Sequence, residues 1–226
     1  RSSARFYIHE KSPYLKKIQK NKNKKYKVNW INDLNKISKY PSIFIANEFF
    51  DALPIKQFIK KKNDWFEKFI ILKNKKFHLV DIKTNSSNIE KLINEKINNN
   101  ENFIEYSPLA FKKLKIVSKI VKKQNGGILI IDYGYNKKRM FNTLQSVKNH
   151  RRNNFLENIY KSDITHMINF YYYKKKITDM KLDYIKLTTQ KDFLINMGIL
   201  QRAEMLSKNV SFSKKSNIYL RLRKLI

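Results

Sequence analysis

Short apolar runs alternate along much of the chain with stretches whose apolar residues recur at helical spacing. The runs with the length and composition of buried strands lie at 5–9, 26–30, 41–46 and 127–132. Ser12 followed by Pro13 predicts a helix start, and the spacing over 109–123 predicts a helix that Gly126 ends. Strand, helix and strand therefore alternate, which predicts an α/β fold with a mainly parallel, doubly wound sheet.

Other parts of the chain follow different patterns. WFEKFIIL, KNKK and FHLVDI predict a β-hairpin with a lysine-rich turn, inserted at about 62–83. The polar stretch 85–102 predicts a surface helix that ends in a loop. The last third predicts helical and loop additions over about 136–226, with a helix after Ile164, a strand near 184–187, and helices from about Gln190 and Ser213. We expect one main domain over 1–226, because 42% hydrophobic residues supply ample core.

The composition excludes several kinds of chemistry. The chain has no cysteine, so disulfides, cysteine-ligated zinc and cysteine nucleophiles are excluded. The four histidines show neither HxxxH nor HxH spacing, so we expect no metal site. No apolar run approaches the roughly 18 residues of a membrane span.

The formal charge of +31 comes almost entirely from lysine. Dense positive charge is typical of nucleic-acid binding, but selection for phosphate contacts should favour bidentate arginine at least as much as lysine. Asn, Ile, Tyr and Phe are also abundant, whereas Gly and Pro number four each, and this joint bias follows AT-rich codons. We therefore favour genome composition over a nucleic-acid partner, and a bacterial cytoplasm over a mitochondrial matrix as the location.

Polar side chains follow three of the predicted strands. They are Glu10, then Asn47, Glu48 and Asp51, then Asp132 and Tyr133. Parallel strands place such residues at one edge of the sheet, where an acid can accept bonds from both hydroxyls of a ribose. Glu10 is the candidate for that role, and the alternative is a solvated glutamate near a helix start.

The most specific stretch is NEFFDALP, residues 47–54. It places two carboxylates and an amide beside two phenylalanines, and buried carboxylates are costly unless a cation or donors meet them. The alternative is a helix N-terminus whose acids complement the dipole. Asp132, two residues before Gly134, predicts a strand end that turns its carboxylate into the ligand-binding crevice, and the alternative is an ordinary passage from strand to loop. Residues 163–166 predict a helix start capped by Asp163.

Six motifs in order resemble the MidA family of S-adenosylmethionine-dependent methyltransferases. They are HEKSPYLKKIQ, ANEFFDALPIKQF, GGILIIDYGY, TLQSVKNHR, SDITHMINF and TTQKDFLINMGILQRAE, and they extend from Tyr7 to about Glu204. The resemblance implies a Rossmann-like class I methyltransferase fold and S-adenosylmethionine as cofactor. It further implies a protein arginine methyltransferase that acts on a subunit of respiratory complex I and supports its assembly.

The same resemblance assigns roles to individual residues. Glu10 takes the ribose position, Asp33 and Leu34 lie at the adenine contact, and Asn47, Glu48 and Asp51 lie on the catalytic edge. We also expect Asn47 to contact the cofactor, and Asp132, Tyr133 and His166 to lie on the substrate side. The family's glycine-rich motif is expected before Arg1 and a final strand after Ile226, so we expect a fragment that binds cofactor poorly by itself. NIYKSD, which ends at Asp163, and the residues after His166 depart from the family pattern.

Methyl transfer to a guanidinium brings two cations together, so carboxylates must offset their repulsion. Glu48 and Asp51 are the expected pair that binds the guanidinium, with Glu48, Asp132 or His166 as the proton acceptor. Two alternatives remain open at this point. The first is an RNA methyltransferase that uses the basic surface, and the second is an assembly factor that keeps the fold without turnover.

Overall fold

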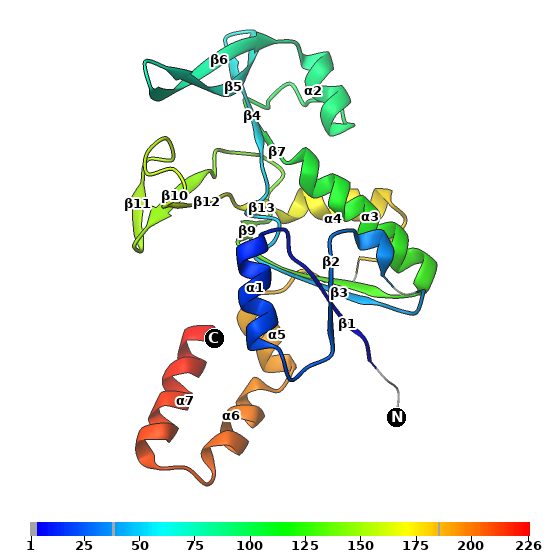
Figure 1. Cartoon of the computed structure of the whole chain (residues 1–226). Helices are drawn as coiled ribbons and strands as arrows, with labels where there is room; N and C mark the ends of the chain where they lie inside the picture. Colours follow the sequence, from blue (N-terminus) through cyan, green and yellow to red (C-terminus); the bar gives the residue numbers. More distant parts are fainter. Residues whose placement is uncertain (1–3, 38, 185) are drawn as a thin grey trace. The chain divides into compact units, whose positions relative to one another are not determined.

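The computed structural model describes residues 4–37, 39–184 and 186–226 (Figure 1). Contacts within the chain divide it into two compact units, Arg1–Leu182 and Asp183–Ile226.

The parallel strands of the first unit occupy the predicted apolar runs. They are β1 Phe6–His9, β2 Val28–Ile31, β3 Ile43–Asn47 and β8 Gly127–Ile131. β1 pairs with β2, and β3 pairs with β8, both in parallel. The α/β class is confirmed, and among the described residues these strands form two hydrogen-bonded pairs.

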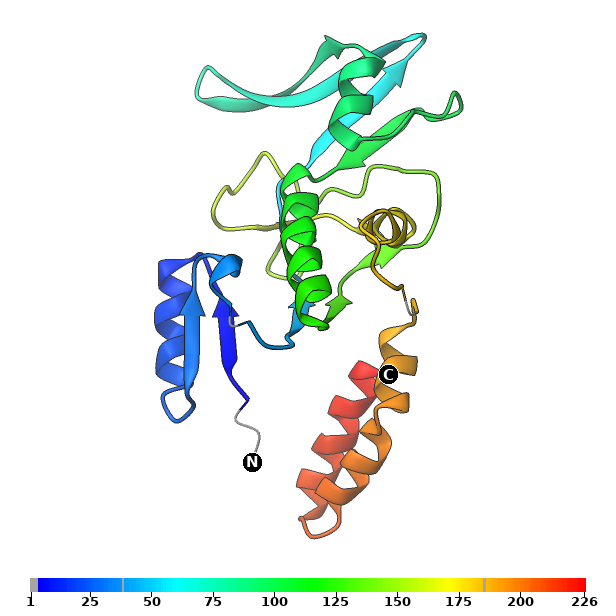
Figure 2. The same cartoon turned by 90° about the vertical axis from the view of Figure 1, so that its right-hand side faces the viewer.

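An antiparallel sheet follows, with the strand order β6-β5-β4-β7. Its strands are β4 Lys56–Lys61, β5 Asp64–Lys73, β6 Lys76–Thr84 and β7 Phe103–Tyr106. The predicted hairpin is confirmed as β5 and β6, which form a long arm in both views (Figures 1 and 2). Asn74 and Lys75 make its turn with positive φ angles of 50° and 60°, the geometry that suits the twist of a two-residue hairpin turn.

Three short strands form an antiparallel sheet and two more form a parallel pair. The first three are β10 Gln145–Lys148, β11 Arg151–Asn153 and β12 Asp163–Thr165, and the pair is β9 Gly134–Tyr135 with β13 Ile168–Asn169. The predicted helix start at Asp163 is therefore wrong. The β-branched Ile164 and Thr165 pair with β10 instead. The helix begins later, as α4 Phe170–Asp179, where the Asn169 side chain accepts a hydrogen bond from the Tyr172 N–H.

The other helices of this unit begin at side-chain caps. They are α1 Pro13–Lys22, the short 3-10 helix η1 Leu34–Lys36, α2 Ser86–Ile93 and α3 Pro108–Gln124. The predicted start of α1 is confirmed, because Ser12 Oγ accepts the Leu15 N–H at 3.2 Å. α3 ends at Gln124, and its cap is Asn125 in the left-handed region, one residue before the predicted stop at Gly126. Gly126 instead allows the backbone to pack closely against Ser42, since a Cβ at this position would lie 2.1 Å from the Ser42 carbonyl oxygen.

Two apolar clusters hold the strand ends in place. α3 covers the β3–β8 pair, where Ala110 and Leu114 pack with Ile128 and Ile130 (Figure 2). A second cluster joins the antiparallel sheet to α2 and α4 through Phe58, Trp65, Ile89, Ile104 and Tyr172. The predicted surface helix α2 therefore buries one face.

The second unit consists of helices α5 Gln190–Asn196, α6 Ile199–Ser207 and α7 Phe212–Leu225. The starts predicted near Gln190 and Ser213 are confirmed, and α6 was not predicted. The strand predicted near 184–187 is wrong for its described residues, because no other described residue of this unit forms a strand that could pair with it. Among the described residues, no helix combines the length and apolarity needed to cross a bilayer.

Candidate active site

Three strand ends meet at one edge of the first unit. β3 and β8 are in register so that Asn47 faces Ile131, and the next residues are Glu48 and Asp132. His9 at the end of β1 contacts Phe49 edge to face, with ring centroids 6.5 Å apart. The structure therefore brings the three polar strand ends of the sequence analysis together.

Glu48 adopts an uncommon backbone conformation at this edge. Its φ is 45°, and its N–H donates to the Ile131 carbonyl at 2.9 Å. A non-glycine residue held in the left-handed region is strained, and such residues cluster at functional sites. The side chains of Glu48 and Asn47 are exposed, so both are accessible to a ligand.

Asp132 fixes the turn that follows β3. Its Oδ2 accepts the backbone N–H groups of Phe50 at 3.1 Å and Asp51 at 3.3 Å, and its Oδ1 accepts the Tyr133 N–H. Burial, and then the neighbouring Asp51 charge, raise the pKa of Asp132 to about 6. Asp132 was predicted on the substrate side, and the structure shows its carboxyl group committed to positioning the turn.

Asp51 is buried, with 4% of its surface exposed. Its Oδ1 has no hydrogen-bond partner among the described residues. Burial, followed by the charge of Glu48, raises the pKa of Asp51. A buried carboxylate without a hydrogen-bond partner is stabilised by a cation that binds both Asp51 and the neighbouring Glu48.

His166 lies directly behind this turn. Its backbone N–H donates to the Asp51 carbonyl at 3.0 Å, and its Nδ1 lies 3.3 Å from the Met167 carbonyl. The ring is buried, and Nε2 has no partner among the described residues. The structure thus places His166 against Asp51, although the helix predicted to present it is absent.

Glu105 and Thr143 hold the His166 segment, and the sequence analysis missed both. Thr143 Oγ1 donates to Glu105 and accepts the Met167 N–H at 2.8 Å. Glu105 also accepts from Gln57 Nε2 at 2.7 Å. Glu105 lies in β7, which follows the loop 98–102 and was not predicted. No local pattern therefore indicated a role for this residue.

Aromatic rings pack with one another at the turn that carries the carboxylates. Phe50 is 3% exposed and contacts Phe49 and Tyr173 edge to face. The Tyr173 hydroxyl is buried without a described partner, and burial and then the Asp132 charge raise its pKa well above the ordinary value. The neighbouring tyrosines point in different directions, since Tyr171 is exposed and Tyr173 is buried.

Glu10 retains capacity to bind a ribose. Its Oε1 accepts the Ser12 N–H at 2.8 Å and its Oε2 accepts Gln19 Nε2 at 3.0 Å. A carboxylate has about four acceptor positions, so both oxygens can accept further bonds from a pair of hydroxyl groups. The acid at the β1 end therefore fits the ribose of a nucleoside cofactor.

The predicted adenine contacts and Tyr133 have local roles in the structure. Asp33 caps η1 by accepting the Asn35 N–H at 3.0 Å, a bond that lowers its pKa. Leu34 is buried against Val117 and Val121, and Tyr133 is 62% exposed. The roles predicted for these residues stay predictions.

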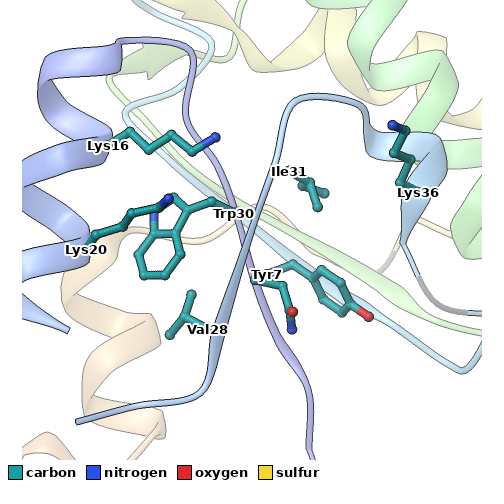
Figure 3. Close-up of a pocket in the computed structure, with 8 residues that line it drawn as sticks. Tyr7, Lys16, Lys20, Val28, Trp30, Ile31 and Lys36 are labelled. Atoms are coloured by element: carbon teal, nitrogen blue, oxygen red, sulfur yellow. The ribbon is translucent and has the colours of Figure 1, made fainter. Parts of the chain in front are cut away.

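A hollow of about 580 Å³ lies elsewhere, along β2 (Figure 3). Lys16, Lys20 and Trp30 lie on one side of the strand and Tyr7 and Lys36 on the other. The described lining contains three lysines and no acid, so it would repel a guanidinium. The described residues also contain no cluster of three or more histidine or acidic side chains able to hold a metal ion. The carboxylate edge is therefore the candidate site for a cationic substrate.

Comparison with known proteins shows which family and which fold the chain resembles. A family model described as "Putative S-adenosyl-L-methionine-dependent methyltransferase" matches residues 1–187. Two solved structures from Burkholderia thailandensis share the fold, with TM-scores of 0.76 and 0.78 at 20% and 19% identity. The two structural alignments cover 95% and 98% of this chain and 60% of each neighbour. The second neighbour is described as bound to S-adenosyl-homocysteine.

Curated relatives carry a more specific name. The chain is 29% identical over 194 residues to "Protein arginine methyltransferase NDUFAF7 homolog, mitochondrial" of Caenorhabditis elegans, which covers 84% of this chain and 45% of the relative. The zebrafish (Danio rerio) and human NDUFAF7 proteins are 28% and 26% identical, over 78% and 79% of this chain and 42% and 40% of their own lengths. The chain thus spans less than half the length of these relatives.

The family match and the shared fold place the chain in the Rossmann-like class of S-adenosylmethionine-dependent methyltransferases. Within that class, the chain belongs to the MidA-like family that the sequence motifs indicated.

Proposed function

We propose that this chain is the substrate-binding part of a methyltransferase that modifies an arginine side chain of another protein. The observation that carries the proposal is the buried Asp51 Oδ1, which has no described partner and lies next to the exposed, strained Glu48. A planar guanidinium presents donors that match two carboxylates. The relatives' printed name supports the same acceptor.

The carboxylates reduce an electrostatic barrier. S-adenosylmethionine supplies, when bound, an electrophilic methyl group on a cationic sulfonium, and Glu10 would hold its ribose. Two unit charges at ~4 Å with an effective dielectric constant near ~20 repel by about 4 kcal/mol. Glu48 and Asp51 neutralise the guanidinium and orient one nitrogen, while the Phe50 ring limits access of water.

The proton of the modified nitrogen passes to a Glu48 carboxylate oxygen in this scheme. Glu48 is exposed and can release the proton to solvent. The oxygens of Asp132 already accept three backbone donors, and His166 is buried. Of the three acceptors expected from the sequence, Glu48 is therefore the one that the geometry favours.

A subunit of respiratory complex I is the proposed acceptor protein, as the family resemblance implies, and a bacterial cytoplasm or mitochondrial matrix is the proposed location. The natural full-length protein with Glu48→Gln should bind S-adenosylmethionine normally and lose methyl transfer on the order of 100-fold. Methylarginine in the acceptor is measured by mass spectrometry. The control is Glu204→Gln, an exposed acid of α6 that should leave transfer unchanged.

Retained turnover in Glu48→Gln would contradict the proposed role of this residue. Methyl groups found on RNA and absent from protein arginine would contradict the proposed acceptor class.

A further inference from the structure

The outer half of the β5–β6 hairpin exposes large apolar side chains. Ile70 pairs with Leu79 and Leu72 pairs with Phe77, and opposite residues of an antiparallel pair share one face. The four side chains are 54%, 42%, 66% and 40% exposed, in the order named. We call these four residues the apolar hairpin face. A contiguous exposed apolar surface of this kind is typical of a binding site.

The edge of the hairpin is also open. β6 pairs only with β5 among the described strands, so alternate backbone N–H and C=O groups along 76–84 face outward without a strand partner there. An open edge beside an apolar face is the arrangement to which an extended peptide adds as a new strand.

The charges of the hairpin are unbalanced at its turn. Each of its acids is paired, with Asp64 to Lys83 at 3.0 Å, Glu67 to Lys56, and Asp81 to Lys61 at 2.7 Å and Lys68 at 3.2 Å. Lys73, Lys75 and Lys76 at the turn have no ion-pair partner among the described residues. The free charge beside the apolar hairpin face is therefore positive.

These three features select the kind of occupant. A second copy of the chain would bring like charges together, because each carries a formal +31. Insertion into a bilayer would leave the open backbone groups of β6 without partners in hydrocarbon, which costs several kcal/mol for each group. A polypeptide strand satisfies those groups, covers the apolar side chains, and can bring acids to the turn.

We propose that β6 and the apolar hairpin face bind an extended acidic segment of a partner protein. The segment pairs with β6 as a fifth strand of the sheet, places apolar residues at alternate positions beside Phe77 and Leu79, and places acidic residues near Lys73, Lys75 and Lys76. This surface is separate from the carboxylate edge and is not used by the proposed methyl transfer.

The test measures binding of short synthetic peptides to the natural protein by fluorescence anisotropy. Two peptides of alternating valine and threonine are used. One carries glutamates at its N-terminal end and the other carries them at its C-terminal end. Saturable binding of one of them is expected, with protection of β6 amides from hydrogen exchange. Replacing the glutamates by lysines, or N-methylating alternate residues, should weaken binding by about tenfold or more.

Protein variants provide the matched comparison. The double change Ile70→Thr and Leu79→Thr keeps strand-forming residues, removes apolar surface and should weaken binding to a similar extent. Tyr26→Thr, which changes another exposed large side chain, should not. The proposal is overturned if neither glutamate peptide binds, or if the N-methylated peptide binds equally well. It is also overturned if the double variant abolishes self-association or binding to anionic vesicles while peptide binding is unchanged.

Discussion

Asp132 Oδ2 accepts the backbone N–H of Phe50 at 3.1 Å, across 82 positions of the sequence. The bond joins the end of β8 to the turn that carries Glu48 and Asp51. The shape of the candidate site therefore depends on a carboxyl group that need not touch the substrate.

Asp132→Asn should change how stability depends on pH. Because the folded-state pKa of about 6 exceeds the ordinary 3.8, the folded protein keeps a proton that the unfolded chain releases. The wild-type free energy of unfolding should therefore fall as pH rises from about 4 to about 6, by roughly 1 to 3 kcal/mol from this group. Asparagine cannot ionise, so urea unfolding should show a flatter profile in the variant. His9, whose burial lowers its pKa, titrates in both proteins and cancels in the comparison.

Equal slopes in the two proteins would show that Asp132 ionises normally in the fold.

Gly134→Ala should destabilise the fold by roughly 1 to 3 kcal/mol. A Cβ at Gly134 would lie 2.4 Å from the Ile168 carbonyl oxygen and 2.6 Å from the Phe170 ring, where β9 meets β13. Gly127→Ala is the control, because a Cβ there has no neighbour within 4 Å and should leave stability unchanged or slightly increased. Thermal unfolding of both variants checks the contrast, and equal melting temperatures would refute it.

Tyr173→Phe should leave the free energy of unfolding unchanged or raise it by up to about 1 kcal/mol, because its buried hydroxyl has no described partner. The neighbouring Tyr172→Phe should lower it by about 1 kcal/mol, since the Tyr172 hydroxyl donates to the Ile93 carbonyl at 2.9 Å. Denaturant unfolding of the pair measures the difference. A larger loss at Tyr173 than at Tyr172 would show that the Tyr173 hydroxyl is bound.

Ser107→Ala should destabilise the protein by about 1 to 3 kcal/mol. Ser107 Oγ donates to the Pro54 carbonyl at 2.7 Å and accepts the Ala110 N–H at 3.2 Å, so it caps α3 and anchors the end of NEFFDALP. Ser12→Ala removes only an exposed cap and should cost less. Chemical unfolding compares the two, and an equal loss would show that the Pro54 bond contributes nothing.

Local sequence determined the elements that depend on interactions between residues close together in the chain. The apolar runs of β3 and β8 gave strands, the lysine-rich turn gave the hairpin, and Ser12 before Pro13 gave the start of α1, because burial pattern, turn chemistry and capping are short-range effects. The same runs placed Glu48 and Asp132 at one edge, since parallel strands end together.

Tertiary contacts decided the rest. β4 reads KQFIKK and becomes a strand only because β5 and β7 pair with it on either side. Asp163 was a plausible cap in sequence, but pairing with β10 made it part of a strand. Asp132 was predicted to face a substrate, yet its partners at positions 50 and 51 show that it positions the turn. The sequence by itself determined which chemical groups reach the sheet edge, whereas the assignment of each group depended on bonds between residues far apart in the chain, which no local pattern contains.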